Sequence, residues 1–138
     1  MSPNMTWLIG RRIKEVKKKD SSWIFALDDG STITTESHWR LITAKGIVVV
    51  SEDDGHPFGL SAPVDAAGRL KDTVGQNTIT RFELKELTSD LVLHFPNGSA
   101  IEFLNFSCGY EGWRTVHRGQ EVICLGGGEL HEFGRSEE

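Results

Sequence analysis

The stretch Trp23–Ile33, WIFALDDGSTI, returns as Leu91–Ile101, LVLHFPNGSAI, and the two align without a gap. Each copy has an apolar residue at every second position, then a turn that ends in Gly30 or Gly98. Such alternation is typical of a β-strand with one buried face, and the glycine-ended turn is typical of a hairpin. The sequence therefore predicts two equivalent β-hairpins.

The register of these hairpins follows from their apolar pattern. A two-residue turn would place Glu102 on the same face as the apolar residues. A three-residue loop that ends in a left-handed glycine instead pairs Phe25 with Ile33 and Leu93 with Ile101. Because a slip of one residue turns every side chain to the other face, the pattern predicts the three-residue loop.

The two halves of the chain correspond beyond the hairpins. Trp39-Arg40 in the first half matches Trp113-Arg114 in the second, and a strand that closes each half follows. Each half is then an antiparallel meander of about four strands. By length, residues 1–138 form a single domain. We expect repeats at 7–51 and 73–126, a linker at 52–72 and a frayed tail at 134–138.

Each meander is expected to begin with a strand, within residues 6–19 in the first half and 74–84 in the second. A bulge in the first would turn Ile13 and Val16 inward. The linker holds the single predicted helix, near 65–74, where apolar residues have helical spacing and Gly75 would end it.

The fold class is therefore all-β, with at most one short helix. A single meander exposes a whole apolar face and is marginal alone, so two copies must cover each other. They can do so as a curved sheet that closes like a barrel or packs like a sandwich, with pseudo-two-fold symmetry in either case. The sequence leaves these two arrangements open.

Composition narrows the class of protein. The longest apolar run, Ile47–Val50, is far too short to cross a bilayer, and Met1–Asn4 lead into no apolar signal segment. Two cysteines do not make a disulfide framework, and we expect reduced thiols in a cytoplasmic protein.

Charge is distributed unevenly along the chain, whose formal net charge is −5. Arg11 to Lys19 hold six of the fifteen basic residues, and acidic residues outnumber basic ones beyond Lys19. Because most of this surface would repel phosphates, we expect no nucleic-acid partner. The lysine-rich segment is typical of a solvated edge strand, and exposed sheet edges would also allow a homodimer.

The segment Asn105–Arg114 is an insertion relative to the first half, and loops on rigid β-scaffolds often carry sites. Tyr110, Glu111, Trp113 and Arg114 are candidates for a surface that binds a ligand or partner. The alternative is a fixed loop, in which Arg114 pairs with Glu111 and Trp113 covers the end of the fold.

Cys108 in the same segment is a nucleophile only if a base lowers its pKa. No spacing places His94 or His117 beside it, so an inert thiol and a non-catalytic protein are expected. No Cys or His pair has zinc-like spacing, so we expect neither metal nor cofactor. The run Gly126–Gly128 is expected to form a turn.

Together with Gly119, the blocks Tyr110–Arg114 and Val122–Leu130 resemble an uncharacterised family of small bacterial proteins. This family, common in actinobacteria, is classed as a domain of unknown function. Its signature is Tyr-Glu-(Ala/Gly)-Trp and a closing Gly-Gly-(Glu/Gly)-Leu. Leu8–Gly10, Val74-Gly75 and Asn97-Gly98 also match, but Leu125 stands where the family often has proline. The resemblance implies no activity, and a role as an immunity-type protein is an analogy.

Three functions remain open from the sequence. The first is a non-catalytic protein-interaction module that binds a basic partner through its acidic surface. The second is a small-ligand binding β-barrel, with a cavity lined by aromatic residues: Trp23, Phe25, Phe103 and Trp113. The third is an enzyme that uses Cys108 with a histidine.

Overall fold

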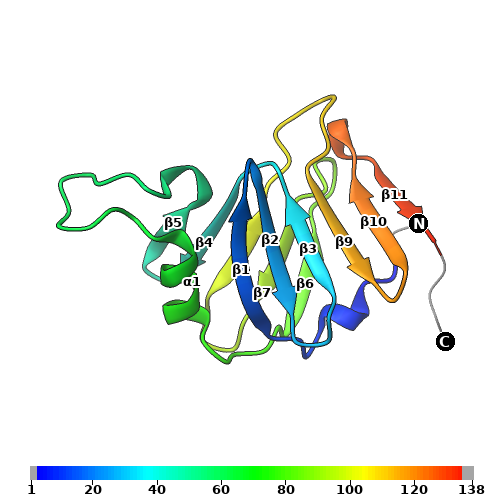
Figure 1. Cartoon of the computed structure of the whole chain (residues 1–138). Coiled ribbons are helices and arrows are strands. Elements are labelled where there is room, and N and C mark those ends of the chain that lie inside the picture. The colour runs from blue at the N-terminus through cyan, green and yellow to red at the C-terminus, as the bar shows by residue number, and fades with distance from the viewer. Residues whose placement is uncertain (1–2, 135–138) are drawn as a thin grey trace.

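The computed structural model describes residues 3–134. In this part of the chain two antiparallel sheets face each other, and the helix α1 lies at one side of them (Figure 1). In chain order the strands and the helix are β1 (Ile13–Lys19), β2 (Ser22–Leu27), β3 (Thr32–Thr35), β4 (Trp39–Thr43), β5 (Gly46–Val50), α1 (Ala66–Val74), β6 (Arg81–Leu84), β7 (Leu91–His94), β8 (Ala100–Phe103), β9 (Trp113–His117), β10 (Gln120–Cys124) and β11 (Leu130–Phe133). Short 3-10 helices lie at Thr6–Leu8, Ser51–Asp53 and Gly126–Gly128.

The architecture is a sandwich. One sheet has the order β1-β2-β3-β9-β10-β11 and the other β5-β4-β8-β7-β6. The two sheets stay separate, so the all-β prediction is confirmed and the barrel alternative is wrong. No helix in residues 3–134 is long and apolar enough to cross a membrane.

Both hairpins have the predicted register. Phe25 lies opposite Ile33, and Leu93 lies opposite Ile101. The N–H of Leu27 donates to the Ser31 carbonyl at 2.9 Å, which closes a three-residue loop. The glycines that end the two loops have φ of 88° and 82°, in the left-handed region that favours glycine. The turn chemistry therefore fixes which faces of β2, β3, β7 and β8 are apolar.

The two halves of the chain exchange sheets after their hairpins. β1, β2 and β3 lie in the larger sheet while β4 and β5 cross to the smaller one, and the second half does the reverse. Trp39 lies opposite Phe103, and Trp113 lies opposite Thr35, at equivalent steps of the two central strand pairs. Each half of the chain therefore contributes strands to both sheets. The repeat bounds and the symmetry axis stay predictions.

The core between the sheets is built from the inward faces of both hairpins and the strands that follow them. Phe25 packs edge-to-face on Trp39 and Phe103, with ring centroids 5.2 and 4.9 Å apart. Trp39, Phe103 and Trp113 are fully buried. Edge-to-face packing places the positive ring edge on the negative face and leaves no room for a ligand between the rings.

The helix α1 forms where the sequence predicts it. The Asp65 carboxylate accepts the N–H of Gly68 at 3.1 Å and caps its first turn, and Gly75 ends it. Its buried side chains are Ala66, Leu70 and Val74, one face at helical spacing.

Several local predictions need correction. Residues 6–8 form a 3-10 helix rather than a strand, and the second predicted strand begins at Arg81 because α1 occupies the chain up to Val74. The bulge in β1 is confirmed by a register shift between Ile13 and Glu15. β11 was not predicted. Of the tail 134–138, only Gly134 lies within the described residues.

Candidate functional site

The segment Asn105–Arg114 divides into a buried anchor and an exposed loop. Trp113 is fully buried, and its indole N–H donates to the Ser89 carbonyl at 2.8 Å. Tyr110 is 83% exposed, and Cys108 is also exposed. Trp113 therefore belongs to the core rather than to a recognition surface. Tyr110, only three residues earlier in the chain, is exposed to solvent.

Arg114 is held by two carboxylates. Its Nε donates to Glu111 Oε1 at 2.9 Å, and Nη1 donates to Glu121 Oε1 at 3.3 Å. The hydrogen bond to Glu111 is the largest cause that raises the pKa of Arg114. The predicted pairing of Arg114 with Glu111 is confirmed. A binding role for Cys108, Tyr110, Glu111 and Arg114 stays a prediction.

The two candidate bases have hydrogen-bond partners other than a thiol. His94 Nε2 bonds to Glu83, and His117 Nδ1 lies 2.7 Å from Ser31 Oγ. Burial raises the pKa of Cys124 to about 11, which disfavours its thiolate. In residues 3–134 no group of three or more potential ligands is placed to hold a metal ion.

The aromatic residues predicted to line a ligand cavity do not do so. Trp23 and Phe25 pack edge-to-face on Trp39, and Phe25 packs on Phe103 in the same way. These rings pack on one another between the two sheets, and a small-ligand function stays a prediction.

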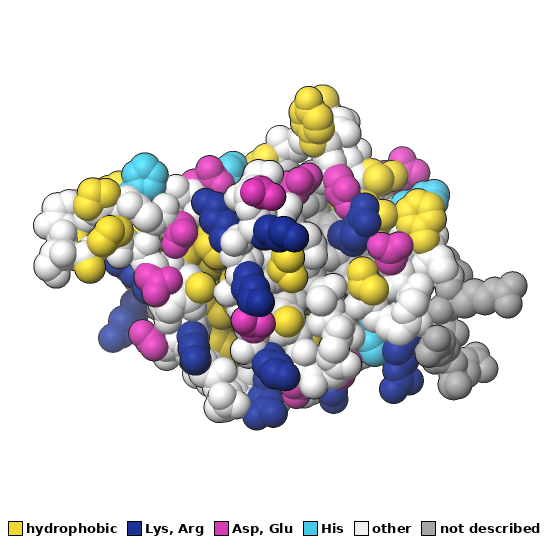
Figure 2. Space-filling view, in the orientation of Figure 1, with side chains coloured by type: hydrophobic (Ala, Val, Ile, Leu, Met, Phe, Trp, Pro, Cys, Tyr) yellow, Lys and Arg dark blue, Asp and Glu magenta, His cyan; other side chains and the backbone are white. Residues whose placement is uncertain are grey.

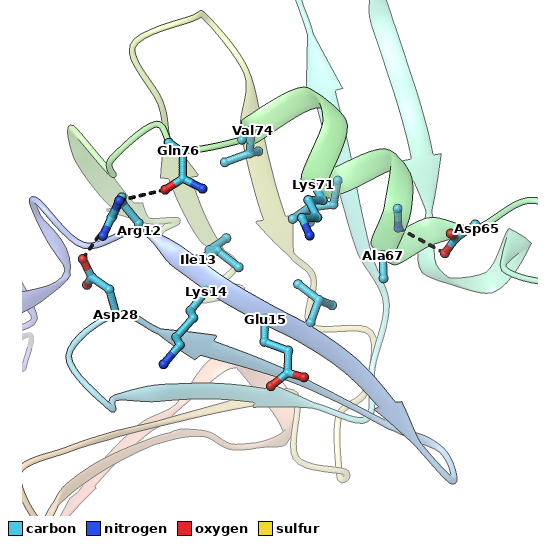
Figure 3. A pocket seen from close by; sticks show the side chains of 14 residues that line it. Arg12, Ile13, Lys14, Glu15, Asp28, Asp65, Ala67, Lys71, Val74 and Gln76 are labelled. Carbon is cyan, nitrogen blue, oxygen red and sulfur yellow. Dashed lines mark hydrogen bonds and ion pairs between the residues drawn. The ribbon is translucent and has the colours of Figure 1, made fainter.

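A groove of about 500 Å³ lies instead outside the core, between the edge strand β1 and the helix α1 (Figure 3). We call it the β1–α1 groove. It is lined by Arg12, Ile13, Lys14, Glu15, Val16, Asp28, Asp65, Ala67, Gly68, Leu70, Lys71, Val74, Gly75 and Gln76. Its volume is in the range of clefts that bind ligands in other proteins.

The lining of this groove is about half apolar and half polar. Ile13 and Val16 are partly buried against the core, while Leu70 and Val74 of α1 are buried beside them. Figure 3 shows Ile13 and Lys71 pointing into the space between strand and helix. In Figure 2, basic side chains lie over β1, with hydrophobic ones visible in the hollow beside them. The groove thus offers apolar contact with cations at its rim.

One wall of the groove is an unpaired strand edge, since β1 is terminal in its sheet. The N–H of Leu27 donates to the Ser31 carbonyl, on the side of β3. Because the N–H and C=O groups of successive residues point to opposite sides of a strand, those of Ala26 point toward β1. Glu15, opposite Ala26, therefore bonds to β2. The N–H and C=O groups of Val16 and Lys18 then point away from β2, along the open edge.

The carboxylates of the groove are already engaged. Asp28 Oδ2 lies 3.4 Å from Arg12 Nε, and Glu15 Oε1 lies 3.4 Å from Lys17 Nζ. In contrast, within residues 3–134 no carboxylate lies within 4.0 Å of the ammonium groups of Lys14 or Lys71. Lys14 and Lys71 therefore present cations that are outside the ion pairs of residues 3–134, although the protein as a whole is acidic. The third lining carboxylate, that of Asp65, accepts the N–H of Gly68 and is also outside those ion pairs.

The sequence predicts each of the two elements that form the groove, but it does not predict that they lie side by side. The lysine-rich segment predicts an edge strand, and the apolar spacing within residues 65–74 predicts the helix. Their proximity depends on α1 packing beside β5 in the other sheet, which no local pattern encodes.

Known proteins give no independent guide to the groove or to the segment Asn105–Arg114. The resemblance to the bacterial family therefore stays a prediction. No protein-family model matches the chain, and no curated protein or solved structure matches it either.

Proposed function

We propose that this protein is a non-catalytic interaction module that binds a segment of another protein in the β1–α1 groove. The observation that carries the proposal is the combination of an unpaired strand edge and an apolar floor in one cleft of about 500 Å³. Backbone groups supply affinity for an extended chain, and an apolar floor selects its side chains. No catalytic constellation is needed for this role.

The position of the groove supports the same proposal. Ile13 and Val16 are part of the rigid sandwich, and α1 is fixed by its buried face. A cleft between two such elements is formed before the partner arrives, which lowers the ordering cost of binding.

Selection from a library of random displayed peptides tests the proposal. Ala67 lines the groove on α1, and Ala67→Trp should fill it. Enriched peptides should bind the wild-type protein and lose at least tenfold in affinity toward this variant. Asp72→Trp, on an exposed position of the same helix that does not line the groove, should bind them normally.

Lys71→Trp provides a second blocked groove at an exposed position, should Ala67→Trp unfold. Circular dichroism and the unfolding midpoint establish that each variant is folded. The proposal is contradicted if no peptide is enriched, or if the enriched peptides bind the blocked variants as tightly as the wild type.

A further inference from the structure

We infer that the occupant of the β1–α1 groove is an extended acidic segment that adds to β1 as an extra strand. This inference rests on the proposed function and specifies its partner. It needs two conditions: backbone groups of β1 that accept a strand, and a charge pattern that selects an acidic one.

The chain itself begins such a ladder. The N–H of Gly10 donates to the Ile79 carbonyl, and the N–H of Ile79 donates to the Arg11 carbonyl, both at 2.8 Å. Ile79 therefore pairs with the segment just before β1, and the chain then turns away to β6 in the other sheet. Beyond this point Val16 and Lys18 keep their N–H and C=O groups on the open edge. A partner strand would continue a ladder that Ile79 has started.

The lysines of β1 decide which strand is accepted. Lys17 and Lys19 pair with outward-facing positions of β2, whereas Lys18 pairs with the inward-facing Trp23. Lys71 adds a cation from the opposite wall. Glutamate or aspartate on either face of an added strand would meet an ammonium group, and lysine would be repelled.

The same charges exclude one competing occupant, a second copy of this chain. Pairing of β1 with another β1 would bring the lysine-rich stretch Lys17–Lys19 against itself. Like charges directly opposite one another destabilise a strand pair, which is how edge lysines prevent association of sheet edges. A lysine-rich edge beside an apolar floor therefore rejects its own copies and admits an acidic chain.

Two synthetic heptapeptides test the charge selection: one alternates glutamate with valine, and the other alternates lysine with valine. Fluorescence anisotropy should show the acidic peptide binding the wild-type protein about tenfold tighter or more, with affinity falling as salt is added. The double variant Lys14→Glu/Lys71→Glu should remove this preference. Lys45→Glu, an exposed lysine that does not line the groove, should retain it.

Backbone pairing is tested separately with two N-methylated forms of the acidic peptide, one methylated at the valine amides and the other at the glutamate amides. In an extended strand these two sets point to opposite sides, so only one set can bond to β1. One methylated form should lose at least tenfold in affinity, and the other should bind like the parent peptide.

The outcomes separate the inference from the function on which it rests. Strand addition by an acidic segment is contradicted if peptides bind in the groove regardless of their charge, or if both N-methylated forms bind like the parent peptide. Either result is still compatible with an interaction module that binds peptides in the groove. Failure of every selected peptide to depend on the groove contradicts both.

Discussion

The ammonium group of Lys18 lies 5.6 Å from the centroid of the Trp23 ring. The two residues are opposite one another in β1 and β2, so both are on the inner face of the sheet. The lysine side chain is exposed, and its charge lies over the Trp23 ring at the border of the core. An inward-pointing charge on an edge strand hinders uncontrolled pairing with another sheet. Lys18 thus protects the edge that an acidic partner would use.

Replacement of Lys18 by valine should increase self-association. The variant keeps the β-propensity of the strand and removes the charge that hinders edge pairing. Sedimentation velocity between micromolar and millimolar concentration should show a mass that rises more steeply than that of the wild type. Lys45→Val, at an exposed turn position, should behave like the wild type. Identical sedimentation of Lys18→Val and the wild type would refute the protective role of this lysine.

Replacement of Gly30 or Gly98 by valine should destabilise the fold. Both glycines have positive φ, and a Cβ at either position would meet no atom within 4 Å, so the cost is backbone strain alone. That strain is about 1–2 kcal/mol for a residue with a side chain, more for a β-branched one. The melting temperature should fall by several degrees, on the order of 3–8 °C.

Gly109 is the matched control for these two positions. A Cβ there also meets no atom within 4 Å, but its φ lies outside the left-handed region. Gly109→Val should melt within a degree or two of the wild type. If all three variants melted alike, the three-residue loops would not depend on left-handed glycines.

Asp65 and Gly68 should show coupled effects on stability. A Cβ on Gly68 would lie 2.3 Å from Asp65 Oδ2, so Gly68→Ala displaces the carboxylate that caps α1. In the wild type the loss of the cap, about 1 kcal/mol, offsets the gain in helix propensity of similar size. In an Asp65→Ala background the cap is already absent, and Gly68→Ala should stabilise by about 1 kcal/mol. Urea unfolding of the four proteins measures this coupling, and strictly additive effects would contradict it.

Glu83 should stabilise the fold only above acidic pH. Its hydrogen bond with His94, followed by that with Lys85, lowers the pKa of Glu83 from 4.5 to about 2. Because the folded pKa is depressed, the stabilisation is complete above pH 4.5 and is lost as pH falls toward 2. The difference in urea midpoint between wild type and Glu83→Gln should be constant above about pH 5 and shrink below it.

Glu86→Gln is the control for this pH dependence, since Glu86 is exposed and makes none of these ion pairs. It should follow the wild type at every pH. A midpoint difference for Glu83→Gln that did not change between pH 6 and pH 2 would show that its pKa is not depressed in the folded protein.

The hairpins could be predicted because local chemistry and burial agree there. The glycine-ended loop sets the register of Phe25 against Ile33, and the same register places the alternating apolar side chains of this hairpin in the core: Trp23, Phe25, Leu27 and Ile33. The helix α1 was predictable for the same reason: its cap, its apolar spacing and its terminal Gly75 all indicate the same span.

The sandwich and the groove could not be predicted in this way. Whether two meanders close as a barrel or pack face to face depends on strand pairing between the halves, such as Trp39 with Phe103, and both closures bury the same residues. The groove depends on the position of α1, which carries Lys71, beside β1 (Figure 3). For Trp113 the sequence left open a recognition surface or a cap over the end of the fold, and its position in β9 places it in the core.

Amide hydrogen exchange of β1 tests the account most directly. With the acidic heptapeptide at saturation, the amides of Val16 and Lys18 should exchange at least tenfold more slowly than in the free protein. Those of Glu15 and Lys17, which already bond to β2, should change little. A saturated complex in which Val16 and Lys18 exchange as fast as in the free protein would contradict strand addition at this edge.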